Sequence, residues 1–214
     1  MNKKPLLKCG VLFDLDGVLL DSEGQYSVFW KSMDELYPTG IEHFSDYIKG
    51  FHLARILSYF ENDEVRQQIV EKLADFENNM RYEFFDGALD LVIGLRYAGV
   101  PTAIVTSSDR KKMESLYMQH PEFPAMFDAI VTGDMVTKAK PDPDCFLMGA
   151  RQLGLNIRDC IVLEDSRNGL IAGRAAGARV IGIATTLDVD EVSALSDMTV
   201  KTVSELTVDR LLFY

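Results

Sequence analysis

The 214-residue sequence lacks the long hydrophobic runs of a membrane protein. No uninterrupted apolar segment approaches the roughly 20 residues that are needed to cross a bilayer. The first ten residues, MNKKPLLKCG, carry positive charge. They are not followed by the apolar core of a signal peptide, because charged residues arrive immediately after Val11–Phe13. We therefore expect a cytoplasmic protein with no membrane partner.

Cysteine and histidine are both scarce, with three residues of each type. The cysteines are scattered, odd in number and without a CxxC pair, so they suggest neither a disulfide framework nor a zinc site. We expect them to be small core residues in a reducing compartment. The histidines show no metal-ligand spacing and are expected to have surface or structural roles. These six residues are Cys9, Cys145, Cys160, His43, His52 and His120.

Positive charge is also in short supply, since 22 Lys and Arg residues face 33 Asp and Glu residues and give a net charge of −11. Such a charge repels the phosphates of nucleic acid and argues against a nucleic-acid partner. Any smaller phosphorylated ligand would need cations placed locally to overcome the same field. The sequence leaves the oligomeric state open between a monomer and a small homo-oligomer.

The segment VLFDLDGVLLDSE places two carboxylates, Asp14 and Asp16, beside Gly17. They follow an apolar run, Lys8–Phe13, which is typical of a buried strand. Burying a carboxylate is costly unless a cation or hydrogen bonds compensate it. The end of this strand is therefore expected to face a positive charge. An EF-hand loop is disfavoured, because Val18 and Gln25 stand where that loop needs oxygen ligands.

Hydrophobic periodicity divides the chain into two kinds of segment. From about residue 22 to residue 82 apolar residues recur every three or four positions, as in a helical bundle. Trp30, with its neighbours Val28 and Phe29, is expected in the core of this part. Afterwards short apolar runs alternate with helical segments, which predicts right-handed crossovers and a parallel sheet.

The predicted fold class is therefore α/β, with a Rossmann-like parallel sheet covered by helices on both faces. An all-helical cap is inserted after the first strand. We expect an α/β core from residues 1–19 and 84–214 and a helical cap from residues 20–83.

Polar residues stand at the carboxyl ends of the predicted strands, where ligands bind in parallel sheets. Since these ends share one edge of the sheet, we expect acids, hydroxyls and a lysine to converge on one crevice. The residues are Asp14 and Asp16 after the first strand, Thr106 and Ser107 after TAIV, Lys140 in KAKPDPD, and Glu164 and Asp165 after CIVL.

The chemistry of these side chains favours a hard cation. Carboxylate oxygens without histidine or cysteine point to Mg²⁺ in preference to Zn²⁺. Lys140 adds a second positive charge and Thr106 a hydroxyl donor, and together they suit a phosphoryl group. A carboxylate beside such a phosphorus is also a competent nucleophile.

Four motifs in this order, FDLDG, VTSS, KAKPDPD and LEDSRNG, resemble those of the haloacid dehalogenase superfamily of phosphotransferases. The similarity spans the whole chain, and the segment EDSRNGLIAGRAAGA is most similar to the branch of beta-phosphoglucomutase and small phosphatases. The resemblance implies that Asp14 is the nucleophile, while Asp16 acts as general acid and then base. Its backbone carbonyl would join Asp14 and Asp165 in holding Mg²⁺.

The same resemblance implies roles for the remaining motif residues. Thr106, Ser107 and Lys140 would hold the phosphoryl oxygens, and Lys140 would also reduce repulsion between the carboxylates. Glu164 would be a further metal ligand or act through a water. Cap and linker polar groups are candidates for substrate recognition, each with a solvated surface role as its alternative: Glu23, His52, Arg55 and Arg81.

The function predicted from this resemblance is Mg²⁺-dependent hydrolysis of a small, sugar-phosphate-like metabolite through a phospho-aspartate. A beta-phosphoglucomutase-type mutase is the alternative. It is disfavoured because Tyr26 or a neighbour replaces the mutase cap-linker histidine, and because Arg55 in KGFHLARIL is displaced by about two positions. A non-catalytic phosphate-binding module is a third reading, and it is disfavoured because Asp14, Asp16, Lys140 and Asp165 are all present.

Several motif residues have structural readings as well. Thr106 or Asp109 could cap the following helix, and Ser166 the one after LED. Gly169, Gly173 and Gly177 are spaced by four, and we expect them to let a helix pack closely on the sheet.

Overall fold

A computed structural model describes residues 9–49 and 51–213. Its centre is a six-stranded sheet in the order β3-β2-β1-β4-β5-β6, and every neighbouring pair is parallel. The predicted α/β class with a Rossmann-like parallel sheet is confirmed. Lys8, the expected first residue of the first strand, lies outside the described residues. The strands are β1 (Gly10–Phe13), β2 (Thr102–Val105), β3 (Ala129–Val131), β4 (Cys160–Glu164), β5 (Arg179–Ile183) and β6 (Met198–Val200).

Helices cover both faces of the sheet, because successive strand residues point to opposite sides. Val11 and Phe13 pack on one face, while Leu12 packs on the other. The first face is covered by α5 (Ala88–Tyr97), α6 (Arg110–Gln119) and α10 (Val208–Leu212). The second is covered by α7 (Asp144–Gln152), α8 (Arg167–Ala176) and α9 (Val189–Leu195). The expected burial of the three cysteines is confirmed.

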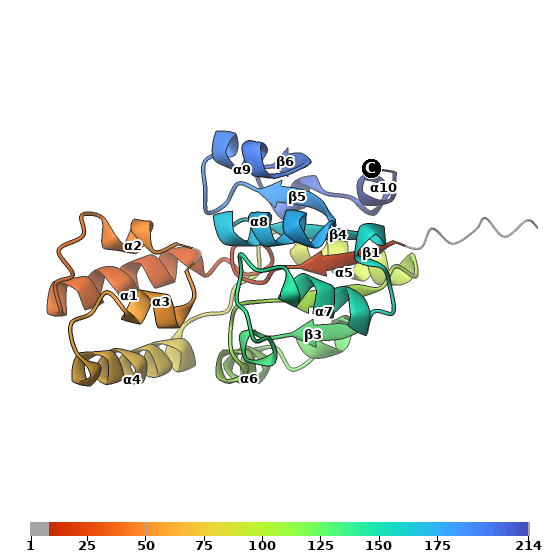
Figure 1. Ribbon diagram of the computed structural model, residues 1–214. Helices are drawn as coiled ribbons and strands as arrows, with labels where there is room; N and C mark the ends of the chain where they lie inside the picture. Colours follow the sequence, from red (N-terminus) through yellow and green to blue (C-terminus); the bar gives the residue numbers. More distant parts are fainter. Residues whose placement is uncertain (1–8, 50, 214) are drawn as a thin grey trace, which may run out of the picture.

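Four further helices form a separate body, which we call the helical body, at one end of the sheet (Figure 1). They are α1 (Glu23–Leu36), α2 (Phe44–Tyr47), α3 (Leu53–Leu57) and α4 (Asp63–Asn79). Phe29 and Trp30 lie in its apolar cluster, as expected, whereas Val28 is 71% exposed. Three consecutive residues cannot all face inward on a helix that turns 100° per residue.

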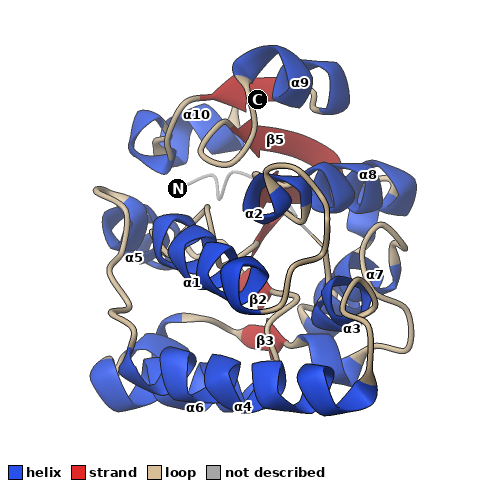
Figure 2. Cartoon of the chain, turned by 90° about the vertical axis from the view of Figure 1, so that its left-hand side faces the viewer, coloured by secondary structure: helices blue, strands red, loops and turns tan. Residues whose placement is uncertain are grey.

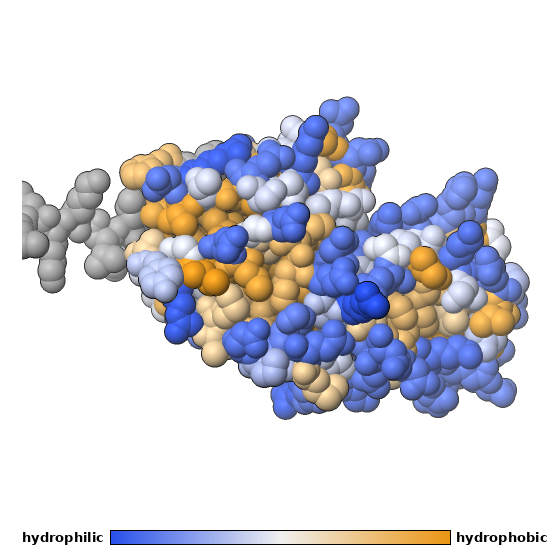
Figure 3. All heavy atoms as spheres, turned by 180° about the vertical axis from the view of Figure 1, so that it is seen from behind, coloured by the Kyte–Doolittle hydropathy of each residue, from blue (hydrophilic) through white to orange (hydrophobic). Residues whose placement is uncertain are grey.

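The helical body stands in front of the sheet edge where the strands end, as Figure 2 shows when it is viewed from that side. In the space-filling view the two parts appear as separate lobes with an indentation between them (Figure 3). The chain enters the helical body beyond β1 and returns before α5. Within residues 9–49 and 51–213, no helix combines the length and apolar character of a membrane span.

The three glycines at four-residue spacing have three different roles. A Cβ on Gly173 would lie 3.0 Å from Val180, so this residue does allow close packing on the sheet. Gly169 instead lies against the Glu164 carboxylate. Gly177 ends α8 with a φ of 88°, which glycine adopts without the strain of a side chain. The expected close packing on the sheet therefore holds for Gly173 and, against Glu164 at the end of β4, for Gly169, but not for Gly177.

Candidate active site

Lys140 joins the ends of three neighbouring strands. Its Nζ donates hydrogen bonds to Asp14 Oδ1 at 2.6 Å, to Glu164 Oε1 at 2.7 Å and to the carbonyl oxygen of Val105 at 3.1 Å. Asp14 follows β1, Glu164 ends β4 and Val105 ends β2. The positive charge expected at the first strand end is thus supplied by a lysine that is 126 residues away in sequence from Asp14.

Burial and mutual charge shift the titration of this cluster. Burial raises the pKa of Asp14 to about 7, although the Lys140 ammonium acts in the opposite direction. Burial also raises the pKa of Asp165 well above its ordinary value, and the nearby Glu164 and Asp14 add to the effect. For Lys140, burial lowers the pKa, but attraction to Asp14 and Glu164 prevails and raises it. More negative charge is gathered here than one ammonium compensates.

Glu164 is fixed through both of its carboxylate oxygens. Oε1 accepts from Lys140, and Oε2 accepts from the backbone amides of Asp165 and Ser166, each at 2.9 Å. The Ser166 hydroxyl donates to the same Oε2 at 3.0 Å. A Cβ on Gly169 would lie only 1.7 Å from Oε1, so this glycine makes room for the carboxylate. Glu164 is therefore itself fixed in position, and with Asp14 and the carbonyl of Val105 it holds Lys140 in place.

The acidic cluster fits a hard divalent cation. One oxygen each from Asp14, Glu164 and Asp165 lies within 4.8 Å of the others. Oδ1 of Asp165 is buried and has no hydrogen-bond partner among the described residues, while Oδ2 accepts from the Thr186 hydroxyl. Buried polar atoms are nearly always paired, so an unpaired Oδ1 beside two further carboxylates fits a site that holds a cation. All donors are oxygens, as Mg²⁺ and Ca²⁺ prefer.

Asp16 has partners different from those of Asp14. Its Oδ2 accepts from Lys112 Nζ at 2.6 Å and from the Ser108 hydroxyl at 3.0 Å, and its Oδ1 accepts from the Ser22 hydroxyl. Burial alone would raise the pKa of Asp16, but the Lys112 ammonium and the two hydroxyls outweigh it and lower that pKa. The two motif carboxylates therefore have separate cations.

Sequence reasoning missed Lys112, Ser22 and Thr186, and it gave Ser108 no role beyond its place in the VTSS motif. Lys112 lies in the first turn of α6, the helix that follows β2 and its site residues, but no motif in the sequence distinguishes it from its neighbours. Its buried ammonium also lies 4.5 Å from the ring centroid of Tyr26 on α1, which no local pattern encodes.

The residues after β2 lie beside Asp16. Thr106 is buried and its Oγ1 accepts from the backbone amide of Ser108 at 3.0 Å. Asp109, and not Thr106, caps α6, because its carboxylate accepts from the backbone amide of Lys112 at 3.0 Å. Ser166 caps α8 as expected, through the backbone amide of Gly169.

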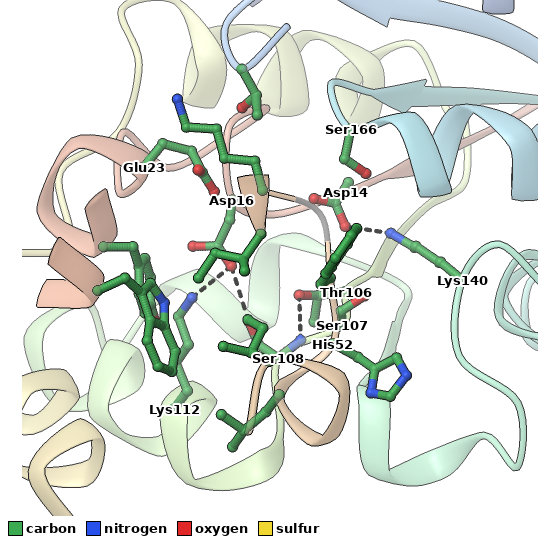
Figure 4. Close-up of a pocket in the computed structure, with 18 of the residues that line it drawn as sticks. Asp14, Asp16, Glu23, His52, Thr106, Ser107, Ser108, Lys112, Lys140 and Ser166 are labelled. Carbon is green, nitrogen blue, oxygen red and sulfur yellow. Dashed lines mark hydrogen bonds and ion pairs between the residues drawn. The ribbon is translucent and has the colours of Figure 1, made fainter. Parts of the chain in front are cut away.

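A cavity of about 260 Å³ lies between the helical body and the strand ends. The catalytic candidates face it from the sheet, and the four helices of the helical body, with the segment between α2 and α3, supply its other walls (Figure 4). Its size suits a small metabolite. The structure brings these predicted site residues to its wall: Asp14, Asp16, Thr106, Ser107, Lys140, Glu164, Asp165, Glu23 and His52.

Two predicted recognition residues do not line this cavity. The guanidinium of Arg55 lies 3.7 Å from the ring centroid of Phe51, on the exposed side of α3. Arg81 is exposed and its guanidinium lies 3.8 Å from Glu83. His52 reaches the cavity wall while its ring Nδ1 accepts from the backbone amide of Arg55 at 3.4 Å, capping α3. The two arginines therefore have partners on the surface, which agrees with their alternative reading.

Residues 11–183 match the family model for haloacid dehalogenase-like hydrolases. The chain belongs to this family. Hexitol phosphatase A of Escherichia coli is 29% identical over 95% of this chain and 96% of its own length. Glycerol-1-phosphate phosphohydrolase 2 of Saccharomyces cerevisiae is 30% identical over 89% of this chain and 81% of its own length.

Among solved structures, a family IA, variant 3 hydrolase of Entamoeba histolytica superposes with a TM-score of 0.82. It is 26% identical and the match covers 96% of this chain and 98% of that one. The identification of the chain as a hydrolase of the haloacid dehalogenase superfamily is confirmed. The two sequence relatives named above are phosphatases.

Proposed function

We propose that the protein is an Mg²⁺-dependent phosphatase that hydrolyses a small phosphomonoester through a phospho-aspartate on Asp14. The observation that carries this proposal is the pairing of Asp14 with Lys140 beside the unpartnered Oδ1 of Asp165. This arrangement places the proposed nucleophile beside the Lys140 ammonium and beside an oxygen that could bind Mg²⁺, at one wall of a small cavity. The phosphatase names of its relatives support the reaction class.

Asp14 is the nucleophile in this scheme, and Lys140 both orients it and attracts the phosphoryl oxygens. Thr106 and Ser107 line the same wall and supply hydroxyl donors. Asp14, Asp165 and the backbone carbonyl of Asp16 would hold Mg²⁺. Glu164 acts through Lys140 and the loop amides that it already binds. When bound, Mg²⁺ supplies positive charge that withdraws electrons from the phosphoryl oxygens.

Asp16 moves the proton. It donates to the leaving oxygen in the first step and accepts from the attacking water in the second, as a general acid and base. Lys112 and the hydroxyls of Ser22 and Ser108 fix the orientation of its carboxylate. Lys112 favours the charged form of Asp16. The free enzyme therefore carries Asp16 in the form that accepts a proton in the second step, and not in the protonated form that the first step needs.

A phosphate-release screen over small phosphomonoesters, with Mg²⁺ and with EDTA, tests the proposal. Wild-type protein is expected to release phosphate in the presence of Mg²⁺ and not in the presence of EDTA. Asp14→Asn is expected to release none in either condition. Phosphate release that survives Asp14→Asn in a folded protein would refute the nucleophile assignment.

The mutase alternative makes a different prediction for one substrate. With beta-glucose 1-phosphate and a trace of the 1,6-bisphosphate, a mutase accumulates glucose 6-phosphate, whereas a phosphatase releases inorganic phosphate. Tyr26, which stands at or next to the place of the mutase histidine, donates a hydrogen bond from its hydroxyl to Glu77 Oε1 at 2.8 Å. The partners of Asp16 are the hydroxyls of Ser22 and Ser108 and the ammonium of Lys112, and none of them is a histidine. The absence of a histidine partner among the described residues favours the phosphatase.

A further inference from the structure

The cavity is strongly acidic beyond its catalytic wall. Seven carboxylates and three ammonium groups line it. Each ammonium already has a carboxylate partner: Lys140 has Asp14 and Glu164, Lys112 has Asp16, and Lys49 has Asp46 at 3.0 Å. Among the described residues that line the cavity there is no arginine and every lysine is already paired, so a second anionic group of a ligand would have to compete with a carboxylate for its cation.

Two carboxylates in the cavity wall, those of Glu23 and Glu77, come from the helical body. Glu23 opens α1 and is half-buried, and the ammonium groups of Lys112 and Lys49 lie near enough to attract its carboxylate. In the close-up its carboxylate points toward Asp16 (Figure 4). Glu77, near the end of α4, accepts from the Tyr26 hydroxyl through Oε1. Carboxylates in these positions accept hydrogen bonds from hydroxyls and repel anions.

The remaining wall of the helical body is apolar or neutral. Trp30, Ile56 and Leu73 provide surfaces for C–H groups, and Ser27 and Ser45 provide hydroxyls. A chain of carbons that each carry a hydroxyl would meet both kinds of contact at once. A second phosphate or a carboxylate would meet Glu23 and Glu77 without a free cation.

We propose that the substrate is a monophosphate with a neutral, polyhydroxylated leaving group, and that Glu23 and Glu77 are the residues that exclude a second anionic group. This inference rests on the proposed phosphatase function and narrows it to a substrate class. Specificity of this kind arises from repulsion of the wrong ligand as much as from attraction of the right one.

Two matched pairs of substrates test the proposal in wild-type protein with Mg²⁺. Glucitol 6-phosphate is paired with 6-phosphogluconate, and glycerol 1-phosphate with 3-phosphoglycerate. Within each pair a terminal CH₂OH is replaced by a carboxylate. We expect kcat/KM to be larger for the neutral member by about 100-fold, because like charges repel strongly when an interface brings them together. Ionic strength should narrow the difference by screening the repulsion.

Glu23→Gln and Glu77→Gln keep the shape and remove the charge. Each is expected to reduce the preference for the neutral substrate by about tenfold, mainly by lowering KM for the carboxylate substrate. Glu35→Gln on α1 and Glu71→Gln on α4 are the controls. Each substitution removes the same charge, but from an exposed residue outside the cavity wall. They should leave the preference unchanged.

The outcomes separate the two proposals. If no substrate of either pair, and none in a wider phosphomonoester screen, releases phosphate, the phosphatase function is wrong. If both members of each pair react within about threefold of one another in wild-type protein, the function stands and the charge exclusion is wrong. The charge exclusion is also wrong if the salt dependence is equal for both members, a measurement that needs no variant to fold.

Discussion

The ammonium of Lys112 lies 2.6 Å from Oδ2 of Asp16, and both side chains are largely buried. Lys112 belongs to α6 of the sheet-containing part, yet it also lies over the ring of Tyr26 from the helical body. Asp16, the proposed proton-transfer residue, is thus held by a cation at the boundary between the two parts. A buried pair of this kind is expected to matter more for orientation than for net stability.

Replacing Lys112 by Met tests this role. Met retains the apolar stem against Tyr26 but leaves the Asp16 carboxylate with two hydroxyl partners. We expect kcat to fall by about 10–100-fold with little change in KM, and the free energy of unfolding to fall by about 1–3 kcal/mol. Steady-state kinetics and urea denaturation measure the two effects. If Lys112 acts through Asp16, adding Lys112→Met to Asp16→Asn should cost little further activity, whereas additive losses contradict the coupling.

Asp14→Asn removes the proposed nucleophile. We expect kcat to fall by at least about 10³-fold, because an amide cannot form the phospho-aspartate. The amide still fills the site and removes a buried negative charge, so far-UV circular dichroism should be unchanged. Asp128→Asn, which alters a carboxylate outside the cavity wall, controls for the general effect of the substitution.

Asp16→Asn removes the proposed proton donor and acceptor. General acid–base groups contribute about 10²–10⁴-fold, so a loss of that size is expected in kcat. Substrates with better leaving groups, such as aryl phosphates, need less protonation and should lose less in the first step. A near-normal rate with an alkyl phosphate would show that another group moves the proton.

Gly169→Ala tests the support behind Lys140. The new methyl group would overlap Glu164, whose Oε1 lies 1.7 Å from the Cβ position. We expect Glu164 to shift away from Lys140, which costs about 1–3 kcal/mol of unfolding free energy and much of the activity. Gly24→Ala is the matched control in another helix, because nothing lies within 4 Å of its Cβ. It should be neutral or slightly stabilising.

Stability without metal should depend on pH through the acidic cluster. The pKa of Asp14 rises from an ordinary 3.8 to about 7 in the folded protein, so the folded state binds a proton that the unfolded state has released. The contribution of this group to stability is therefore fully present below its ordinary pKa of 3.8 and is lost as the pH rises to about 7. Asp16, whose pKa is lowered, acts oppositely but only below its ordinary value of 3.8.

Mg²⁺ should offset this decline, since the proposed site would hold it through the ionised carboxylates. We expect Mg²⁺ to raise the melting temperature by several degrees at pH 8 and by much less at pH 5. Differential scanning fluorimetry with Mg²⁺ or EDTA measures the shift, and Asp165→Asn should reduce it. An equal shift at both pH values would contradict the site.

The sequence was most informative where strands end. Asp14, Lys140, Glu164 and Asp165 could be brought together because a parallel sheet places all its carboxyl ends at one edge. Lys112 could not, since its side chain reaches the site from a helix, and helix faces are set by packing that no motif records. Asp14 and Asp16 line the same cavity just beyond the end of β1, but the sequence did not indicate that they would have different cationic partners. The strand β6 and helices α9 and α10 were not anticipated from the C-terminal residues.

The two segments that join the helical body to the sheet run side by side. The backbone amide of Asp21 donates to the carbonyl of Glu83, and that of Phe85 donates to the carbonyl of Leu19, both at 2.9 Å. Neither segment belongs to a strand of the sheet. Because the two connections are neighbours, a different set of helices could be inserted between them during evolution without displacing the residues at the strand ends. The substrate could then change while the reaction at the strand ends stays the same.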